Sequence, residues 1–82
     1  MLKKTELRES SLGWIRSLPR ARVFDLSEIY RFLEYSFPDE CNGRGDAKME
    51  PRCRNDARWA VFDAKRERLI APTGRRGEYR RY

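Results

Sequence analysis

The segment over residues 50–81 constrains the fold of this chain more than any other. Small apolar residues recur at helical spacing over residues 51–67, and the positions between them are largely basic. Leu69 and Ile70 then begin a short extended stretch, which a Pro-Thr-Gly turn separates from a second one around Tyr79. The last third of the chain is therefore predicted to fold as helix, strand, turn and strand. The small apolar positions of the helix are Cys53, Ala57, Ala60, Val61 and Ala64.

A first helix is predicted over residues 5–18, and Pro19 ends it because proline cannot continue a helix. Gly13 lies inside this segment and weakens the helix by up to about 1 kcal/mol relative to alanine. The helix therefore depends on packing against the rest of the domain. Its apolar face consists of Leu7, Trp14, Ile15 and Leu18, with Leu12 at the margin.

A second helix is predicted over residues 26–36, where apolar residues recur every three or four positions. Asp25 before it can accept hydrogen bonds from the free amide groups of the first turn, and Glu28 can fold back onto the amide of Asp25. Phe24 and Ile29 flank this capping box and can pack together as a hydrophobic staple. The local sequence thus specifies how the chain enters the helix.

The remaining segments are short. Residues 20–24 can form an extended piece that pairs with the C-terminal hairpin, as the β-branched Val23 permits. Residues 38–48 are polar, contain glycine and lack an apolar period, so a surface loop is predicted there. In the hairpin, residues 69–71 are predicted as one strand, residues 72–76 as the tip and residues 77–81 as the returning strand.

The 82 residues suffice for one small domain and leave little room for an enclosed catalytic pocket. We predict a single α+β domain over residues 1–82, with three helices followed by an antiparallel hairpin of two or three strands. Residues 1–22 form the N-terminal helix and a linker in this prediction, and residues 23–82 form the core.

Charge is divided unevenly along the chain. Residues 1–43 hold seven basic and seven acidic residues, whereas residues 44–82 hold twelve basic and six acidic ones, so the second half accounts for the net charge of +6. Arginine outnumbers lysine 15 to 4, which favours planar, bidentate contacts with phosphate groups or guanine edges. This distribution indicates a nucleic-acid-binding domain.

Cys41 and Cys53 are the only cysteines and histidine is absent, so the usual four-ligand zinc site cannot form within one chain. No cofactor is predicted. The sequence shows no signal-like or membrane-spanning apolar run, so a cytoplasmic protein with reduced thiols is the default, although a disulfide between the two cysteines is compatible with the sequence.

Enzyme activity is not expected, because histidine, the usual near-neutral base, is missing. A metal-dependent nuclease site ending in Asp63 and Lys65, with Asp46 or Asp56 as a second metal ligand, is the weaker alternative. A helix turns Asp63 and Lys65 to different faces, which argues against such a site.

The outer face of the predicted 51–67 helix is basic and aromatic. Its small inner side permits close packing, while long donors project outward as a helix that enters a major groove requires. The hairpin tip adds adjacent guanidinium groups that suit phosphates or a narrow minor groove. The alternative in both places is an ordinary solvated surface. The candidate DNA-binding residues are Arg52, Arg54, Asn55, Arg58, Phe62, Lys65, Arg66, Arg75, Arg76 and Arg80.

Trp59 and Phe62 both fall on the side of this helix that faces away from the alanines. Trp59 is predicted to pack against the rest of the domain and Phe62 to be exposed. The methyl group of thymine or of a modified cytosine, or an unstacked base, could cover an exposed ring.

The run from Ala57 to Lys65, followed by Leu69-Ile70 and by Arg76-Gly77-Glu78-Tyr79-Arg80, resembles bacterial winged-helix domains associated with restriction endonucleases. The resemblance covers residues 24–81 and implies a small winged helix whose third helix reads the major groove. Its wing would touch phosphate or the minor groove. Arg68 stands where a glycine usually ends the helix, and Ala64 replaces a larger aliphatic residue. The contacts that the resemblance implies are Asn55, Arg58, Phe62, Lys65, Arg75 and Arg76.

The sequence therefore predicts binding of double-stranded DNA through a basic recognition helix and an arginine-rich wing, in a regulator or in the recognition part of a restriction-type system. The alternative is a winged-helix protein-interaction module that binds an acidic partner protein. A separate protein subunit is left open as a partner, and binding to a membrane is not expected. Nothing resembles a dimerisation helix, so a monomer and a weak dimer both stay open.

Overall fold

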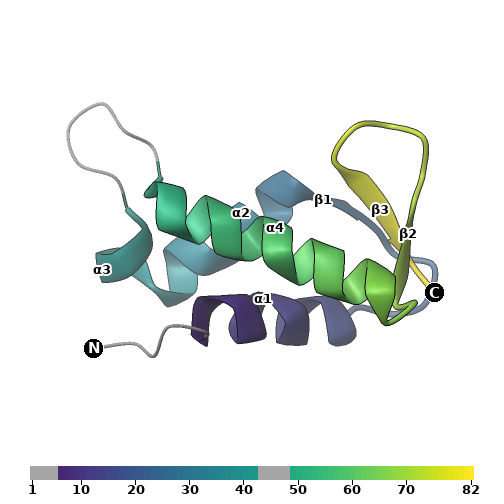
Figure 1. The fold of residues 1–82 in the computed structure, drawn as a ribbon, viewed down its shortest axis with the longest axis horizontal. Helices are drawn as coiled ribbons and strands as arrows, with labels where there is room; N and C mark the ends of the chain where they lie inside the picture. Colours follow the sequence, from purple (N-terminus) through teal and green to yellow (C-terminus); the bar gives the residue numbers. More distant parts are fainter. Residues whose placement is uncertain (1–5, 43–48) are drawn as a thin grey trace.

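The longest helix, α4 (Pro51–Arg66), crosses the middle of the molecule, and the other elements lie around it (Figure 1). The computed structural model describes residues 6–42 and 49–82. These residues form a small α+β fold with a three-stranded antiparallel sheet, as predicted, and with one helix more than expected. The elements are α1 (Glu6–Arg16), β1 (Val23–Asp25), α2 (Leu26–Ser36), α3 (Pro38–Cys41), α4, β2 (Ile70–Pro72) and β3 (Glu78–Arg81).

The inner face of α4 carries small side chains, and neighbouring elements cover it. α1 packs along this face more extensively than any other element and brings Leu7 and Ile15 into the common core. Ser11 is buried with them, and its hydroxyl donates a hydrogen bond to the backbone oxygen of Leu7 at 2.8 Å. The predicted start of α1 at Thr5 lies outside the described residues. The predicted inner residues of α4 are all buried: Cys53, Ala57, Ala60, Val61 and Ala64.

The predicted capping box at the start of α2 is confirmed. The Asp25 carboxylate accepts a hydrogen bond from the Glu28 amide at 3.2 Å, and the Glu28 carboxylate accepts one from the Asp25 amide at 3.0 Å. Two amide groups are thereby satisfied reciprocally. Phe24 before the cap and Ile29 after it are both buried in the core. The start of α2 is therefore fixed by residues that are adjacent in the sequence.

The predicted surface loop over residues 38–48 is wrong at its start, where residues 38–41 form α3. Proline fits the first helical position, and Asp39 and Glu40 follow in the first turn, where negative charge is favourable. Residues 43–48 of the predicted loop lie outside the described part of the chain. The default of reduced thiols is also wrong, because Cys41 forms a disulfide with Cys53, with Cα atoms 5.6 Å apart. This bond ties α3 to the first turn of α4.

Replacing both cysteines by serine is expected to lower the free energy of unfolding by about 2 to 3 kcal/mol, because the disulfide closes a loop in the unfolded chain. Urea unfolding followed by circular dichroism gives this difference. A reducing agent should destabilise the native protein to a similar degree and leave the double variant unchanged. Equal stability of the two proteins under oxidising conditions would contradict the prediction.

The sheet connects the segment before α2 with the C-terminal hairpin. β3 is the central strand and pairs antiparallel with β1 on one side and β2 on the other. β1 confirms the predicted extended piece, although it begins at Val23. The hairpin strands lie within one residue of their predicted bounds. Phe24 pairs with Tyr79 across the sheet, with ring centres 5.9 Å apart, so this face of the sheet continues the core.

The end of α4 places an arginine in a position that usually holds glycine. The Arg68 amide donates to the Lys65 carbonyl at 3.0 Å, and the Leu69 amide donates to the Ala64 carbonyl at 2.9 Å. These are the two hydrogen bonds of a Schellman motif, which needs a left-handed residue after the helix. Arg68 adopts that conformation, with a φ angle of 59°. Its Cβ atom makes the conformation unfavourable relative to glycine.

Arg68→Gly is expected to raise the free energy of unfolding by about 0.5 to 1 kcal/mol, because glycine adopts a positive φ without a Cβ clash. Thermal unfolding by calorimetry measures the gain. Arg68→Ala removes the same charge and keeps the Cβ atom, so it should give no comparable gain. If alanine stabilises as much as glycine, charge rather than backbone conformation is responsible.

Candidate nucleic-acid interface

Two acidic side chains at the end of α4, those of Asp63 and Glu67, are bound by arginines of α1. Arg8 of α1 donates two hydrogen bonds to the Asp63 carboxylate, at 2.6 and 2.7 Å. Arg16, further along α1, donates one to Glu67 at 2.6 Å. The packing of α1 against α4 is thus accompanied by charge pairing along the contact.

Burial and pairing shift two carboxyl groups of α4 in opposite directions. The hydrogen bonds from Arg8 hold the pKa of Asp63 below its usual value, against the opposing effect of burial. Burial raises the pKa of Asp56, and the positive charges of Arg52 and Arg8 only partly oppose this. The Oδ2 atom of Asp56 is buried and has no hydrogen-bond partner among the described residues. Arg8 therefore interacts with both carboxyl groups.

Four predicted residues form one surface along α4, which we call the α4 ridge: Asn55, Arg58, Phe62 and Lys65. They recur every three or four residues and are all exposed. Two adjoining hollows share Arg58 and Phe62, one toward the sheet and one on the outer side of the helix. Within residues 6–42 and 49–82, neither charged residue of the ridge forms an ion pair.

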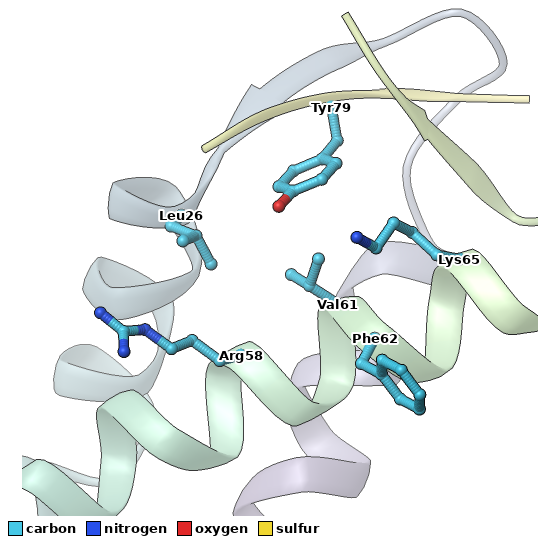
Figure 2. Close-up of a pocket in the computed structure, with 6 residues that line it drawn as sticks. All are labelled: Leu26, Arg58, Val61, Phe62, Lys65 and Tyr79. Atoms are coloured by element: carbon cyan, nitrogen blue, oxygen red, sulfur yellow. The ribbon is translucent and has the colours of Figure 1, made fainter. Parts of the chain in front are cut away.

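The hollow toward the sheet has a volume of about 100 Å³ and lies between α4, the start of α2 and β3 (Figure 2). Leu26 and Val61 contribute apolar walls. Tyr79 reaches from β3 toward α4, and the Nζ atom of Lys65 lies 5.7 Å from the centre of its ring (Figure 2). With Arg58, the hollow is bordered by a guanidinium, an ammonium and a hydroxyl group. This set of donors suits a phosphate group.

Trp59 is exposed over 50% of its surface, so the prediction that it packs into the domain is wrong. It lies too far around the helix from the alanines to reach the core, and packs against neighbours at the surface instead. Its ring meets that of Phe62 edge to face, with centres 5.6 Å apart. The Arg8 guanidinium lies 5.1 Å from the centre of the Trp59 ring. The predicted exposure of Phe62 is confirmed, at 48%.

The hairpin tip presents Arg75 and Arg76 to solvent. The Thr73 hydroxyl donates a hydrogen bond to the Glu78 carboxylate at 2.7 Å and accepts one from the Arg75 amide at 3.4 Å. The acid of the hairpin is thereby bound within the loop, and neither tip arginine pairs with an acid in the described part of the chain. The tip extends away from α1 (Figure 1).

Arg52 and Arg54 lie apart from the ridge, near the beginning of α4. Arg54 lines a hollow toward α2 together with Arg31 and Glu34. Arg52 borders a hollow in which the other charged residues are acidic: Asp39, Glu40 and Glu50. The surroundings of Arg52 are therefore less suited to an anion than those of Arg58.

Arg66 and Arg80 are also less suited to bind an anion together with the α4 ridge. The Arg66 guanidinium lies 5.8 Å from the centre of the Phe62 ring and 3.7 Å from the Asp63 carboxylate, so an acid partly neutralises it. Arg80 follows Tyr79 on β3, and alternation along a strand places the two side chains on opposite faces of the sheet. The structure thus brings the four ridge residues together on one surface, but it does not gather all ten predicted contacts there.

Arg8 is the residue that the sequence pattern did not single out. Its partner Asp63 is 55 residues away, and no local spacing marks such a pair. For the weaker nuclease alternative, Asp63 would have to give up its hydrogen bonds with Arg8, and Asp46 lies outside the described residues. No cluster of three potential metal ligands occurs in the described residues. No described helix is both long and apolar enough to cross a membrane.

Comparison of the chain with protein-family models, with curated proteins and with solved structures found no match. The resemblance to restriction-associated winged helices therefore stays a prediction. The function has to be argued from the charges and surfaces described above.

Asp63→Asn should lower the melting temperature near neutral pH, and the difference from the native protein should shrink toward acid. Folding lowers the pKa of Asp63, so its pairing stabilises the protein above the unfolded pKa of about 3.9, and this contribution is lost as the pH falls below it. Thermal unfolding of both proteins over a pH series measures the difference. The pKa of Asp25 is also lowered, chiefly by a hydrogen bond from Ser27. Because both proteins contain Asp25, its contribution cancels in the difference between their melting temperatures. A difference that stays constant with pH would contradict this origin.

Proposed function

We propose that this protein binds double-stranded DNA through the α4 ridge and the hairpin tip, in a regulator or in the recognition part of a restriction-type system. The observation that supports this most is the separation of charge about α4. Asp63 and Glu67 are bound by arginines of α1, whereas Arg58 and Lys65 pair with no acid in residues 6–42 or 49–82. Donors without competing acids suit a polyanion, because each phosphate contact releases counterions.

The order of the elements supports a winged-helix assignment. Helix, strand, two helices, the long helix and two strands follow along the chain, and the sheet order is β1-β3-β2. In this proposal α4 is the recognition helix that enters the major groove, and the β2–β3 hairpin is the wing. The disulfide between α3 and α4 would hold the beginning of the recognition helix.

Different parts of the interface are assigned different tasks. Asn55 and Arg58 would contact base edges, since asparagine pairs well with adenine and arginine with guanine in the major groove. Lys65, whose Nζ atom lies over the Tyr79 ring, would bind a phosphate at the hollow toward the sheet. Arg75 and Arg76 would contact phosphates or a narrow minor groove. Of the other five predicted contacts, Phe62 would offer apolar surface and the four arginines would add to the positive field: Arg52, Arg54, Arg66 and Arg80. No residue is assigned a catalytic role.

Arg58→Ala and Arg75→Ala are expected to weaken DNA binding in different ways. Loss of Arg58 should reduce the preference among duplex sequences, and loss of Arg75 should weaken all duplexes about equally, each by about 1 to 3 kcal/mol. Fluorescence anisotropy at several salt concentrations measures affinity, and Arg75→Ala should reduce the slope of log affinity against log salt by about 1. Arg16→Gln is the control, because it removes a charge already bound to Glu67. Equal losses for Arg16→Gln and Arg75→Ala would contradict the assignment.

The second candidate is a protein-interaction module that binds an acidic partner. The exposed rings of Trp59 and Phe62 favour it, because aromatic residues and arginine are enriched in protein interfaces. The same titration separates the two functions. Several phosphate contacts lower affinity by about 10³ or more between about 50 and 200 mM salt, whereas an aromatic protein interface responds less.

A further inference from the structure

Trp59 and Phe62 place apolar surface in the middle of a basic helix face. About half of each residue is exposed, and the rings are nearly perpendicular, at 83°. An edge-to-face pair leaves a corner between the face of one ring and the edge of the other. Contact with an apolar group of a partner would remove this exposed surface from water, which is favourable.

The outer hollow of the α4 ridge lies at this corner. It has a volume of about 300 Å³ and is lined by Asn55, Arg58, Trp59 and Phe62. All four residues belong to α4, so the hollow is open on the side that faces away from the helix. It therefore combines an apolar floor with an amide and a guanidinium group at its border.

Charge complementarity restricts what can occupy this hollow. Arg58 has no acidic partner within the described ranges, and the nearest paired acid of α4, Asp63, is bound by Arg8. A polyanion with an exposed apolar group fits both properties. In the major groove of duplex DNA, that group is the methyl at C5 of a pyrimidine.

We infer that α4 reads the C5-methyl group of a pyrimidine, thymine or 5-methylcytosine, in the major groove. Trp59 and Phe62 form the surface that receives the methyl group, and Asn55 and Arg58 bind the neighbouring base edges. The inference rests on the proposed function and specifies the class of duplex that α4 prefers. The amide of Asn55 matches adenine, which is paired with thymine, so one A·T pair can meet both the amide and the rings.

An extruded or unpaired base fits the hollow less well. Extrusion costs a few kcal/mol in lost stacking and pairing, and enzymes that flip bases recover this by enclosing the base in a pocket. Here a single helix lines the hollow, so no second wall faces the rings. The guanidinium groups of Arg8 and Arg66 already lie over the Trp59 and Phe62 rings. A methyl group needs only the free corner.

The test compares duplexes that differ only in the methyl group. An alternating adenine–thymine duplex is compared with the same duplex carrying uracil, and an alternating guanine–cytosine duplex with the same duplex carrying 5-methylcytosine. Burial of one methyl group corresponds to about fourfold in affinity. The native protein is expected to bind at least one methylated member about fourfold more tightly than its unmethylated counterpart. The two arms show whether thymine or 5-methylcytosine is the source.

Trp59→Ala and Phe62→Ala are each expected to abolish the preference for the methylated duplex over its unmethylated counterpart. Both residues lie outside the core, so the variants should fold, which circular dichroism checks. Tyr35→Ala is the matched control. It removes an aromatic residue that is 88% exposed on α2 and should leave the preference unchanged.

Three results would overturn the inference. Equal affinity for methylated and unmethylated duplexes, with salt-dependent binding retained, refutes methyl recognition and leaves the proposed function standing. Tighter binding to the thymine-containing single strand than to the duplex indicates stacking on an unpaired base instead. Absence of salt-dependent binding to any duplex refutes the proposed function, and the inference with it.

Discussion

The close packing of α1 and α2 against α4 is the constraint on which the rest of the structure depends. Alanine occupies three buried positions of α4, and the larger apolar side chains come from its neighbours. α1 contributes Leu7 and Ile15, and α2 contributes Ile29 and Leu33. The first helix, which the winged-helix resemblance leaves out, thus supplies volume that Ala64 does not. Because α1 and α2 supply most of the core volume, α4 contributes mainly small side chains to the core, and its long side chains lie on the exposed sides of the helix.

The distribution of charge follows from this packing. A largely buried carboxylate is strongly unfavourable without a partner, so placing Asp63 at the α1 contact requires a cation such as Arg8. The same guanidinium lies over the Trp59 ring, so one residue neutralises an acid and supports an exposed aromatic residue. Among the described residues, Asp63 pairs with Arg8 and Arg66 and does not pair with Arg58 or Lys65 of the α4 ridge. The electrostatic character of the outer surface is therefore a by-product of how α1 is bound.

Features determined by neighbouring residues could be predicted from the sequence. The capping box at Asp25, the small inner face of α4 and the hairpin bounds all depend on spacings of a few residues. The Arg8–Asp63 pair and the disulfide depend on distant segments meeting, which spacing does not encode. Helical projection placed Trp59 away from the alanines correctly but gave no information about which neighbours cover it. α3 has only four residues, too few for an apolar period.

The candidate interface gains rigidity from the two ends of α4. The disulfide between Cys41 and Cys53 fixes the first turn to α3, and the Schellman motif at Arg68 leads directly into β2. The Nζ atom of Lys65 lies over the ring of Tyr79 on β3, and α4 also packs against β2, so the helix and the hairpin are held together. A surface whose parts are already ordered loses less conformational entropy on binding. For the DNA binding proposed above, the α4 ridge and the hairpin would therefore lose little conformational entropy, which favours discrimination between similar duplexes.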